Sequence, residues 1–451
     1  MGISRRVLLQ ASAAGVALGG LGTARAARKL KPAFYFPGMD PQEIAKAAKP
    51  KERIGKTVNI GFLAALSGPD SGWGLPGITG NQLFIDEVNS QGGLLVGGIR
   101  YPLKMYEFDD EAIANKALQG AKELVYKHDV KFISAIGGNP ADAVHPFLTK
   151  HKVIYASLIS TDIKPDRPYL IAGGDVTPRI DMLRPWYIKF AHGNLNRWAV
   201  VSQDDTIGQT SQAWEVGCAL AEGWKVVYDE HYALETTDFA PVVTAILATK
   251  PDAVSLNLSY PDFVVGLCAQ LYLQGFKGSI SANYMETSSI LQKVPKAWFE
   301  GAVDSFPLFD DPWWGEPSLQ HDFIRDWKSR YGTGAPQDVH RNITGIDWDH
   351  LITLKVWARG CQLAGSFDPD AVLKALRAAH SFPTILGPAK MAGKDMWGID
   401  NMISPPIPIC EVRDGIKRIQ AKVRYEQWFA SRKDAIIKVV RDKGQMWDQR
   451  A

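Results

Sequence analysis

The stretch 58–110 constrains the fold of this chain most strongly. It contains, in order, an apolar strand, a turn at Ser67-Gly68-Pro69, an amphipathic segment and a second strand that ends in Asp109-Asp110. The order strand, turn, helix, strand is typical of a parallel α/β unit. It predicts a helix N-terminus with unpaired backbone N–H groups beside a flexible loop that carries one exposed aromatic residue, Trp73. We expect this arrangement to hold a small anionic molecule rather than to perform chemistry.

Strand and helix signals continue to alternate beyond this unit, at intervals of about 20–30 residues. Apolar runs predict strands at 58–64, 101–108, 131–136, 153–158, 198–201, 225–228 and 253–256. Asp238 is expected to cap a helix over 239–248 that stops before Pro251. Further helices are predicted over 318–330 and 347–363. This alternation indicates parallel sheets covered by helices.

At 451 residues the chain is long enough for two domains, each with its own core. A chain that builds one lobe, builds a second and then returns to the first is typical of a two-lobe hinge protein. We therefore predict an α/β fold with two lobes of mainly parallel sheet flanked by helices. The predicted parts are a signal peptide at 1–26, a linker at 27–56, a first lobe at 57–176 plus about 305–385, a second lobe at 177–304 plus about 386–414, and a helical extension at 415–451. The extension is expected to pack on a lobe, or else to bind a partner.

The N-terminus has the pattern of a twin-arginine export signal. Arg5 and Arg6 precede an apolar run over 7–22, and Ala24-Arg25-Ala26 has the small-x-small form of a cleavage site. The alternative is a membrane anchor, but the run is weakly hydrophobic and shorter than the ~20 residues that a span needs. We expect removal of the signal and delivery to the periplasm by the twin-arginine route.

Charge and cysteine usage exclude some classes of function. Removing three arginines with the signal lowers the 51 basic residues to 48, against 48 acidic ones, so no basic groove for nucleic acid is expected. The four cysteines, Cys218, Cys268, Cys361 and Cys410, show no metal-binding spacing. Either Cys218 and Cys268 form a disulfide, or the cysteines are buried free thiols.

Signatures of catalysis are missing from the sequence. It contains no GxSxG elbow, P-loop, HExxH motif or dinucleotide fingerprint. The nearest approach to a metal cluster is the group His340, Asp347, Asp349 and His350, whose acids we expect to cap a helix instead. We therefore predict a protein that is not an enzyme and has no metal and no cofactor. We also expect it to be a monomer.

Several groups of residues follow one another in the order seen in one receptor family. They are Ser67-Gly68-Pro69 with Trp73-Gly74, the helix to Asn89 with Gly92-Gly93, Asp109-Asp110, Gly137 after a strand, Asp204-Asp205 with Gly208, Thr237-Asp238-Phe239, and Pro251-Asp252-Ala253. Each group alone is weakly specific, but the ordered set covers roughly residues 57–410. With this set the chain resembles the leucine/isoleucine/valine-binding family of periplasmic solute receptors, type I periplasmic binding proteins that serve ABC importers.

The resemblance implies two lobes that are joined by three crossovers and close on a solute in the cleft. It also implies which positions contact the solute. These are Trp73 at the cleft lip, Asn139, Pro140 and Ala141 in a carboxylate-holding loop, Ile159, Ser160 and Thr161 in its partner loop, and Ile207, Tyr260 and Tyr284 or the nearby Glu286 on the second lobe.

Three of these positions depart from the pattern of amino-acid binders. Ala141 stands where a serine holds the ligand carboxylate, and Ile207 replaces an aromatic residue. Tyr284 stands at or near the acid that pairs with the ligand ammonium. A buried ammonium without a carboxylate costs several kcal/mol, so an α-amino acid is disfavoured unless Glu286 takes that role.

These departures lead to a hypothesis about the ligand. We expect a small organic solute, a carboxylate, an amide or an aromatic compound, that stacks on Trp73, Tyr260 and Tyr284. The expected function is capture of this solute for a membrane ABC permease. The alternatives are a sensor that passes ligand-dependent closure to a signalling partner, and an exported enzyme on a related scaffold.

Overall fold

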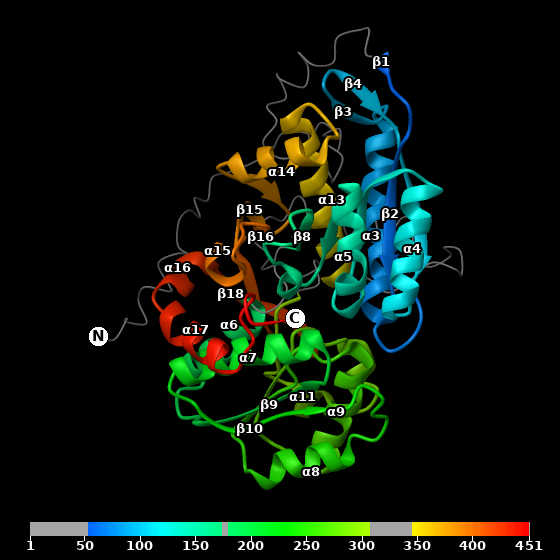
Figure 1. The fold of residues 1–451 in the computed structure, drawn as a ribbon. Helices are drawn as coiled ribbons and strands as arrows, with labels where there is room; N and C mark the ends of the chain where they lie inside the picture. The colour runs from blue at the N-terminus through cyan, green and yellow to red at the C-terminus, as the bar shows by residue number, and fades with distance from the viewer. Residues whose placement is uncertain (1–52, 174–178, 307–344, 451) are drawn as a thin grey trace, which may run out of the picture. The chain divides into compact units, whose positions relative to one another are not determined.

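The computed structural model describes residues 53–173, 179–306 and 345–450 (Figure 1). The predicted signal peptide at 1–26, nearly all of the predicted linker and the helix predicted over 318–330 lie outside these residues. Among the residues that the structure describes, no helix combines the length and apolar character needed to cross a membrane.

The first large sheet has eight strands in the order β14-β15-β16-β8-β7-β6-β2-β5. Their bounds are β2 Val58–Ala64, β5 Leu103–Asp109, β6 Val130–Ala135, β7 Ile154–Ser157, β8 Leu170–Ala172, β14 Phe382–Thr384, β15 Gly387–Ala392 and β16 Met402–Ser404. The neighbouring strands β5, β2, β6, β7, β8 and β16 pair in parallel. Strands β14 and β15 are antiparallel additions at one edge. We call this sheet and the helices packed on it the first lobe.

The second large sheet has seven strands in the order β10-β9-β11-β12-β13-β17-β18. Their bounds are β9 Arg197–Gln203, β10 Lys225–Tyr232, β11 Ala253–Ser255, β12 Ser279–Ser281, β13 Val303–Asp304, β17 Ile407–Arg413 and β18 Ile416–Val423. Strands β10 to β13 pair in parallel, whereas β17 and β18 form an antiparallel edge. We call this sheet and its helices the second lobe. A small sheet of β1 Arg53–Ile54, β4 Ile99–Tyr101 and β3 Leu94–Val96 completes the described strands.

Helices connect and cover these strands. In the first lobe they are α3 Ser71–Ser90, α4 Ala114–Tyr126, α5 Asn139–His151, the short 3-10 helix η1 Ser160–Asp162, α13 Gly345–Ala364, α14 Pro369–Ala378 and α15 Lys394–Trp397. In the second lobe they are α6 Arg179–Ala191, α7 Thr206–Ala221, α8 Ala240–Ala248, α9 Pro261–Leu273, α10 Thr287–Ile290 and α11 Lys296–Phe299, and α16 Tyr425–Ala430 and α17 Lys433–Asp442 follow β18. The predicted α/β fold with mainly parallel sheets is confirmed.

Helix α3 corrects the expectation of an exposed aromatic residue on a flexible loop. Trp73 lies in the first turn of α3 with only 4% of its surface exposed. The neighbouring glycines serve helix packing, because a Cβ at Gly80 would lie 2.1 Å from the carbonyl oxygen of Asp347 in α13. A Cβ at Gly77 would lie 2.5 Å from the His350 ring. Helices α3 and α13 therefore approach each other at a distance that only glycine permits.

The division of the chain into domains stays a prediction. Strands β15 and β16 hydrogen-bond within the first-lobe sheet, although the stretch 386–414 that contains them is predicted for the second lobe. Within the predicted helical extension, 415–451, strand β18 precedes α16 and α17, and α17 packs against α7. The four cysteines lie in the described residues as buried free thiols, so the alternative of a disulfide between Cys218 and Cys268 is wrong in this structure.

Candidate functional site

The carboxyl ends of the parallel strands of both sheets meet around one small cavity. The residues that line it come from both lobes. The first lobe contributes Ile136, Leu158 and Ile159, which follow β6 and β7, together with Trp73 of α3 and Ile346 of α13. The second lobe contributes Leu258, Asn283 and Phe306, which follow β11, β12 and β13. Ligands of open parallel sheets bind outside the carboxyl ends of the strands. The cavity measures about 10 Å³, whereas a cavity of about 150 Å³ holds a molecule such as benzene. Entry of a solute therefore requires these side chains to separate.

Trp73 is held by a buried histidine of α13. His350 Nε2 lies 2.9 Å from the Trp73 carbonyl oxygen, and its Nδ1 lies 3.4 Å from Ser134 Oγ. Burial lowers the pKa of His350 to about 4, so the ring is neutral at physiological pH. A neutral ring that donates from Nε2 to Trp73 can accept at Nδ1 from Ser134. This pair of contacts fixes the start of α3 beside the cavity.

An aromatic contact joins the two lobes at the cavity. The rings of Trp73 and Tyr260 meet edge to face with their centres 5.2 Å apart. The Tyr260 hydroxyl donates to Asp205 Oδ2 at 2.8 Å, and Asp205 Oδ1 accepts from the Gly208 N–H at the start of α7. Trp73 and Tyr260, two of the predicted site residues, are thus brought together. Their binding roles stay predictions.

The predicted carboxylate-holding loops are joined by a carboxylate of the chain itself. Asp162 Oδ2 accepts from the Gly138 N–H at 3.0 Å and from Ser157 Oγ at 2.7 Å. A Cβ at Gly137 would lie 2.2 Å from the same oxygen, so glycine allows this approach. Burial first, and the nearby Asp142, raise the pKa of Asp162 to about 7. Asp162 therefore occupies one donor at the start of α5 and one at the end of β7 that a ligand carboxylate would otherwise use.

The other predicted residues of these loops are mostly buried. The Ala141 N–H donates to the Gly138 carbonyl at 2.8 Å, and Pro140 is buried in the first turn of α5. Ser160 and Thr161 are buried in η1, next to the cavity-lining Ile159. The loops thus place Ile159, but not Ala141, among the residues that line the cavity.

Asn139 and Ile207 form a second contact between the lobes. Thr206 Oγ1 at the start of α7 donates to Asn139 Oδ1 at 2.7 Å. The side chain of Ile207 lies so close to Gly138 that a Cβ there would be 2.4 Å from its Cδ1. Both residues therefore support the approach of the lobes beside the cavity, outside its lining.

Tyr284 and Glu286 contact other residues of the second lobe instead of lining the cavity. The Tyr284 ring packs edge to face on Phe306, with its centre 5.7 Å away, and Lys417 Nζ lies 4.6 Å above it. Glu286 caps α10, where its Oε2 accepts from the Ser289 N–H at 2.7 Å. Burial alone would raise the pKa of Glu286, but hydrogen bonds from Ser289 and Ser288 outweigh it and lower the pKa. Neither residue lines the cavity.

Asn283, a residue missed by the sequence analysis, is the polar member of the cavity lining. Its Nδ2 donates to Asp181 Oδ1 at 3.3 Å, and its backbone N–H donates to the Asn257 carbonyl at 2.7 Å. Asp181 is in turn paired with Arg184 at 2.6 Å, and both side chains are fully buried. The position of Asn283 just beyond β12 was the available signal, because polar side chains at strand carboxyl ends commonly face ligands.

Three buried acids from both lobes lie near the Trp73–Tyr260 contact. Asp70 precedes α3, Asp110 follows β5 and Asp205 precedes α7. Burial first, then the charges of Asp110, Asp205 and Asp109, raise the pKa of Asp70 to about 7. Burial and Asp109 raise the pKa of Asp110 to about 6, and burial also raises that of Asp205. Raised pKa values of this kind often mark functional sites.

A metal centre is not indicated by the described residues, which contain no group of three or more His, Cys, Asp or Glu arranged to hold a metal ion. Asp347 accepts from Thr79 Oγ1 at 2.5 Å, and His350 serves Trp73. Asp347 and His350 are therefore engaged in the packing of α3 on α13, while His340 lies outside the described residues.

Solved structures share this fold. A solute-binding protein of an ABC transporter from R. palustris, in complex with 4-hydroxybenzoate, is 18% identical, with 82% of this chain and 96% of that chain covered and a TM-score of 0.64. A protein from Rhodopseudomonas palustris BisB5 with 3,4-dihydroxybenzoic acid is 17% identical, with coverages of 82% and 98% and a TM-score of 0.65. The leucine-binding protein LivK of Thermotoga maritima is 15% identical, with coverages of 82% and 100% and a TM-score of 0.66.

The family model described as "Periplasmic binding protein" matches residues 57–415. This match spans the first large sheet, all of the second except its edge strand β18, and the strand ends that line the cavity. It confirms the family resemblance drawn from the sequence motifs. The chain therefore belongs to the periplasmic binding protein family, whose members are solute-binding receptors rather than enzymes.

Proposed function

We propose that this protein captures a small aromatic solute with one polar end, a hydroxyl, carboxyl or amide group, and delivers it to an ABC importer. The observation that carries the proposal is the lining of the interlobe cavity, in which seven apolar side chains surround the single amide of Asn283. Such a lining suits an apolar body, and one polar group fixes its orientation.

An α-amino acid fits this site poorly at both of its charged ends. The lining contains no carboxylate that could pair with an ammonium, and Glu286 caps α10 instead. Asp162 already takes the Gly138 N–H and the Ser157 hydroxyl between the two predicted carboxylate loops. A buried ammonium without a carboxylate partner is costly. This cost separates leucine and its relatives from an aromatic acid, which meets the same occupied donors but carries no ammonium.

Aromatic ligands are also supported by solved structures of the same fold. Two of the similar proteins hold 4-hydroxybenzoate and 3,4-dihydroxybenzoic acid. Trp73 offers an indole surface, and Phe306 a ring, on opposite lobes of the cavity. Stacking on such rings contributes about 0.5–1.5 kcal/mol beyond area burial.

A calorimetric and thermal-shift screen tests this function. The probes are 4-hydroxybenzoate, benzoate, benzamide and leucine, each at a large excess over protein. A ligand at 100 times its dissociation constant adds about 2.7 kcal/mol to the free energy of unfolding, so we expect a clear rise in melting temperature with an aromatic probe and none with leucine. Stabilisation by leucine without stabilisation by any aromatic probe contradicts the proposal.

A pair of variants locates the binding site. Trp73→Ala removes a cavity wall and is expected to weaken binding of the active probe at least tenfold. Trp298→Ala is the matched control, because Trp298 lies in α11 and does not line the cavity. Equal loss of affinity in both variants would show that the effect comes from general destabilisation.

A further inference from the structure

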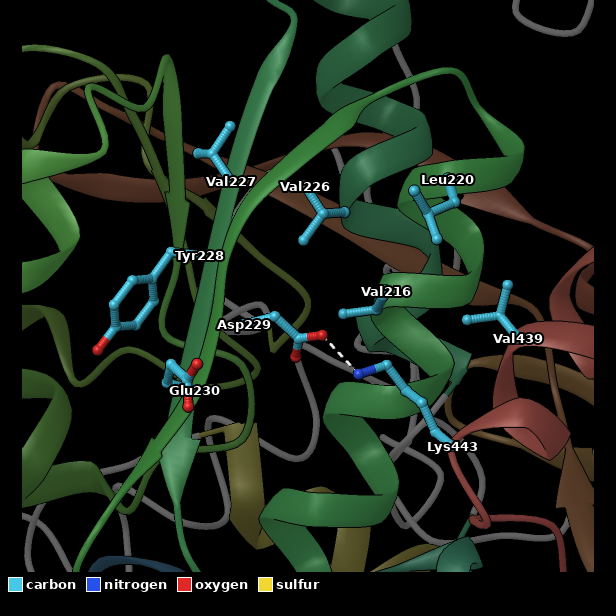
Figure 2. A pocket seen from close by; sticks show the side chains of 9 residues that line it. All are labelled: Val216, Leu220, Val226, Val227, Tyr228, Asp229, Glu230, Val439 and Lys443. Atoms are coloured by element: carbon cyan, nitrogen blue, oxygen red, sulfur yellow. Dashed lines mark hydrogen bonds and ion pairs between the residues drawn. The ribbon is translucent and has the colours of Figure 1, made fainter.

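The C-terminal tail packs on α7 of the second lobe, and the start of α17 also reaches α15 of the first lobe through the Lys433–Asp395 ion pair. Helix α17 packs along α7, and a Cβ at Gly217 of α7 would lie 3.0 Å from the Ile436 carbonyl oxygen. Figure 2 shows Lys443 beyond α17 facing Asp229 of β10, and their ion pair measures 2.5 Å. Valines of α7, β10 and α17 line the groove of about 440 Å³ beside this pair. The tail is therefore firmly attached to the second lobe.

The last described residues then contact both lobes. On the second lobe, Thr210 Oγ1 donates to Gln445 Oε1 at 2.9 Å and accepts from Arg450 Nη1 at 3.2 Å. On the first lobe, Lys164 Nζ donates to the Arg450 carbonyl at 3.3 Å. Lys164 lies in the loop that follows η1 and its predicted site residues Ser160 and Thr161.

An aromatic contact reinforces the first-lobe side. The Trp447 ring lies so close to Gly398 that a Cβ there would be 2.8 Å from its Cε2, and equally close to Pro165 Cγ. The Arg450 guanidinium lies 5.6 Å from the centre of the Trp397 ring. Trp397 in α15 also meets Trp214 of α7, with ring centres 5.4 Å apart. The tail thus covers a place where the two lobes touch directly.

We propose that residues 445–450 act as a latch between the lobes. They are carried by α7 of the second lobe and hold Lys164 in the first-lobe loop after η1, so they stabilise the arrangement in which the lobes meet around the cavity. Opening of the cleft requires Trp447 to leave Gly398 and Arg450 to leave Lys164. The latch therefore sets the balance between open and closed forms of the solute-free protein.

Distance measurement by pulsed electron spin resonance tests the latch without any ligand. Spin labels at Lys122→Cys in α4 and Leu273→Cys in α9, both exposed and on different lobes, report the separation of the lobes. Relative to the full chain, a chain ending at Gln445 is expected to show a broader distribution whose long-distance fraction at least doubles. Trp447→Ala combined with Arg450→Gln is expected to do the same.

Controls separate the latch from general damage. Lys438→Ala removes an ion pair with Asp442 within α17 and touches neither lobe contact, so its distance distribution should match that of the full chain. Near-ultraviolet circular dichroism confirms that each variant is folded. An unchanged distance distribution in a folded double variant overturns the latch. This readout does not depend on solute identity, so it can fail or succeed independently of the proposed function.

Discussion

At the scale of single residues, Asp162 makes the clearest prediction. Its pKa of about 7 in the folded chain, raised mainly by burial, compares with about 3.9 for an unfolded chain. A raised carboxyl pKa favours folding most below pH ~4, and this contribution is lost as the pH rises to about 7. Asp162→Asn keeps the group neutral at every pH. For this variant we expect the free energy of unfolding to decline less between pH 4 and 7 than it does in the unaltered protein. At pH 8 it should exceed that of the unaltered protein by an amount on the order of 1–3 kcal/mol.

Denaturant titrations from pH 4 to 8 check this expectation. The exposed Asp166 in the following loop provides the control, Asp166→Asn, which should leave the pH profile unchanged. A variant at Asp162 that loses stability at pH 8 would mean that the ionised carboxylate is needed by the Gly138 and Ser157 donors.

Individual site residues were harder to predict than the region that contains them. Trp73 and Ile159 line the cavity and Tyr260 contacts Trp73, because strand ends and helix starts of a parallel sheet converge there. Asn283 was not predicted, and Glu286, a predicted site residue, caps α10. A shift of one to three residues beyond a strand end decides whether a side chain faces the cavity or caps the next helix, and sequence alone does not fix that turn.

At the scale of elements, the packing of α3 on α13 depends on the missing side chain of Gly80. Gly80→Ala would place a Cβ 2.1 Å from the Asp347 carbonyl oxygen. The backbone of α13 would have to shift to relieve this contact, which costs more free energy than moving the end of a flexible side chain. Overpacking of this kind costs about 1–3 kcal/mol. Chemical unfolding should therefore show that loss for Gly80→Ala. Gly193→Ala, where a Cβ would meet nothing within 4 Å, should change stability by less than about 0.5 kcal/mol.

The elements themselves followed from the sequence where they are long and buried. Strand β2 has the predicted bounds, and β6, β7 and β9 lie close to theirs, because buried parallel strands are nearly continuous apolar runs. The short strands β12 and β13 carry too few residues to give a pattern. The sequence analysis expected Trp73 on a flexible loop, whereas in the structure α3 already begins at Ser71 and its Gly77 and Gly80 allow α13 to approach.

At the scale of the whole molecule, meeting of the lobes brings Asp205 of the second lobe near Asp70 of the first lobe. Burial first, and then neighbouring acids including Asp205, raise the pKa of Asp70 to about 7, and that of Asp110 lies at about 6. Raising the pH from 5.5 to 8 therefore adds negative charge beside the cavity.

If the solute carries a carboxylate, its affinity should fall several-fold over this range, because like charges repel most strongly away from water. Titration calorimetry with benzoate measures this fall, and the neutral benzamide should show a much smaller one. Asp70→Asn should make the affinity for benzoate depend less on pH. If the affinities for benzoate and benzamide fell equally with pH, the pH dependence would come from closure of the lobes and not from repulsion of the solute.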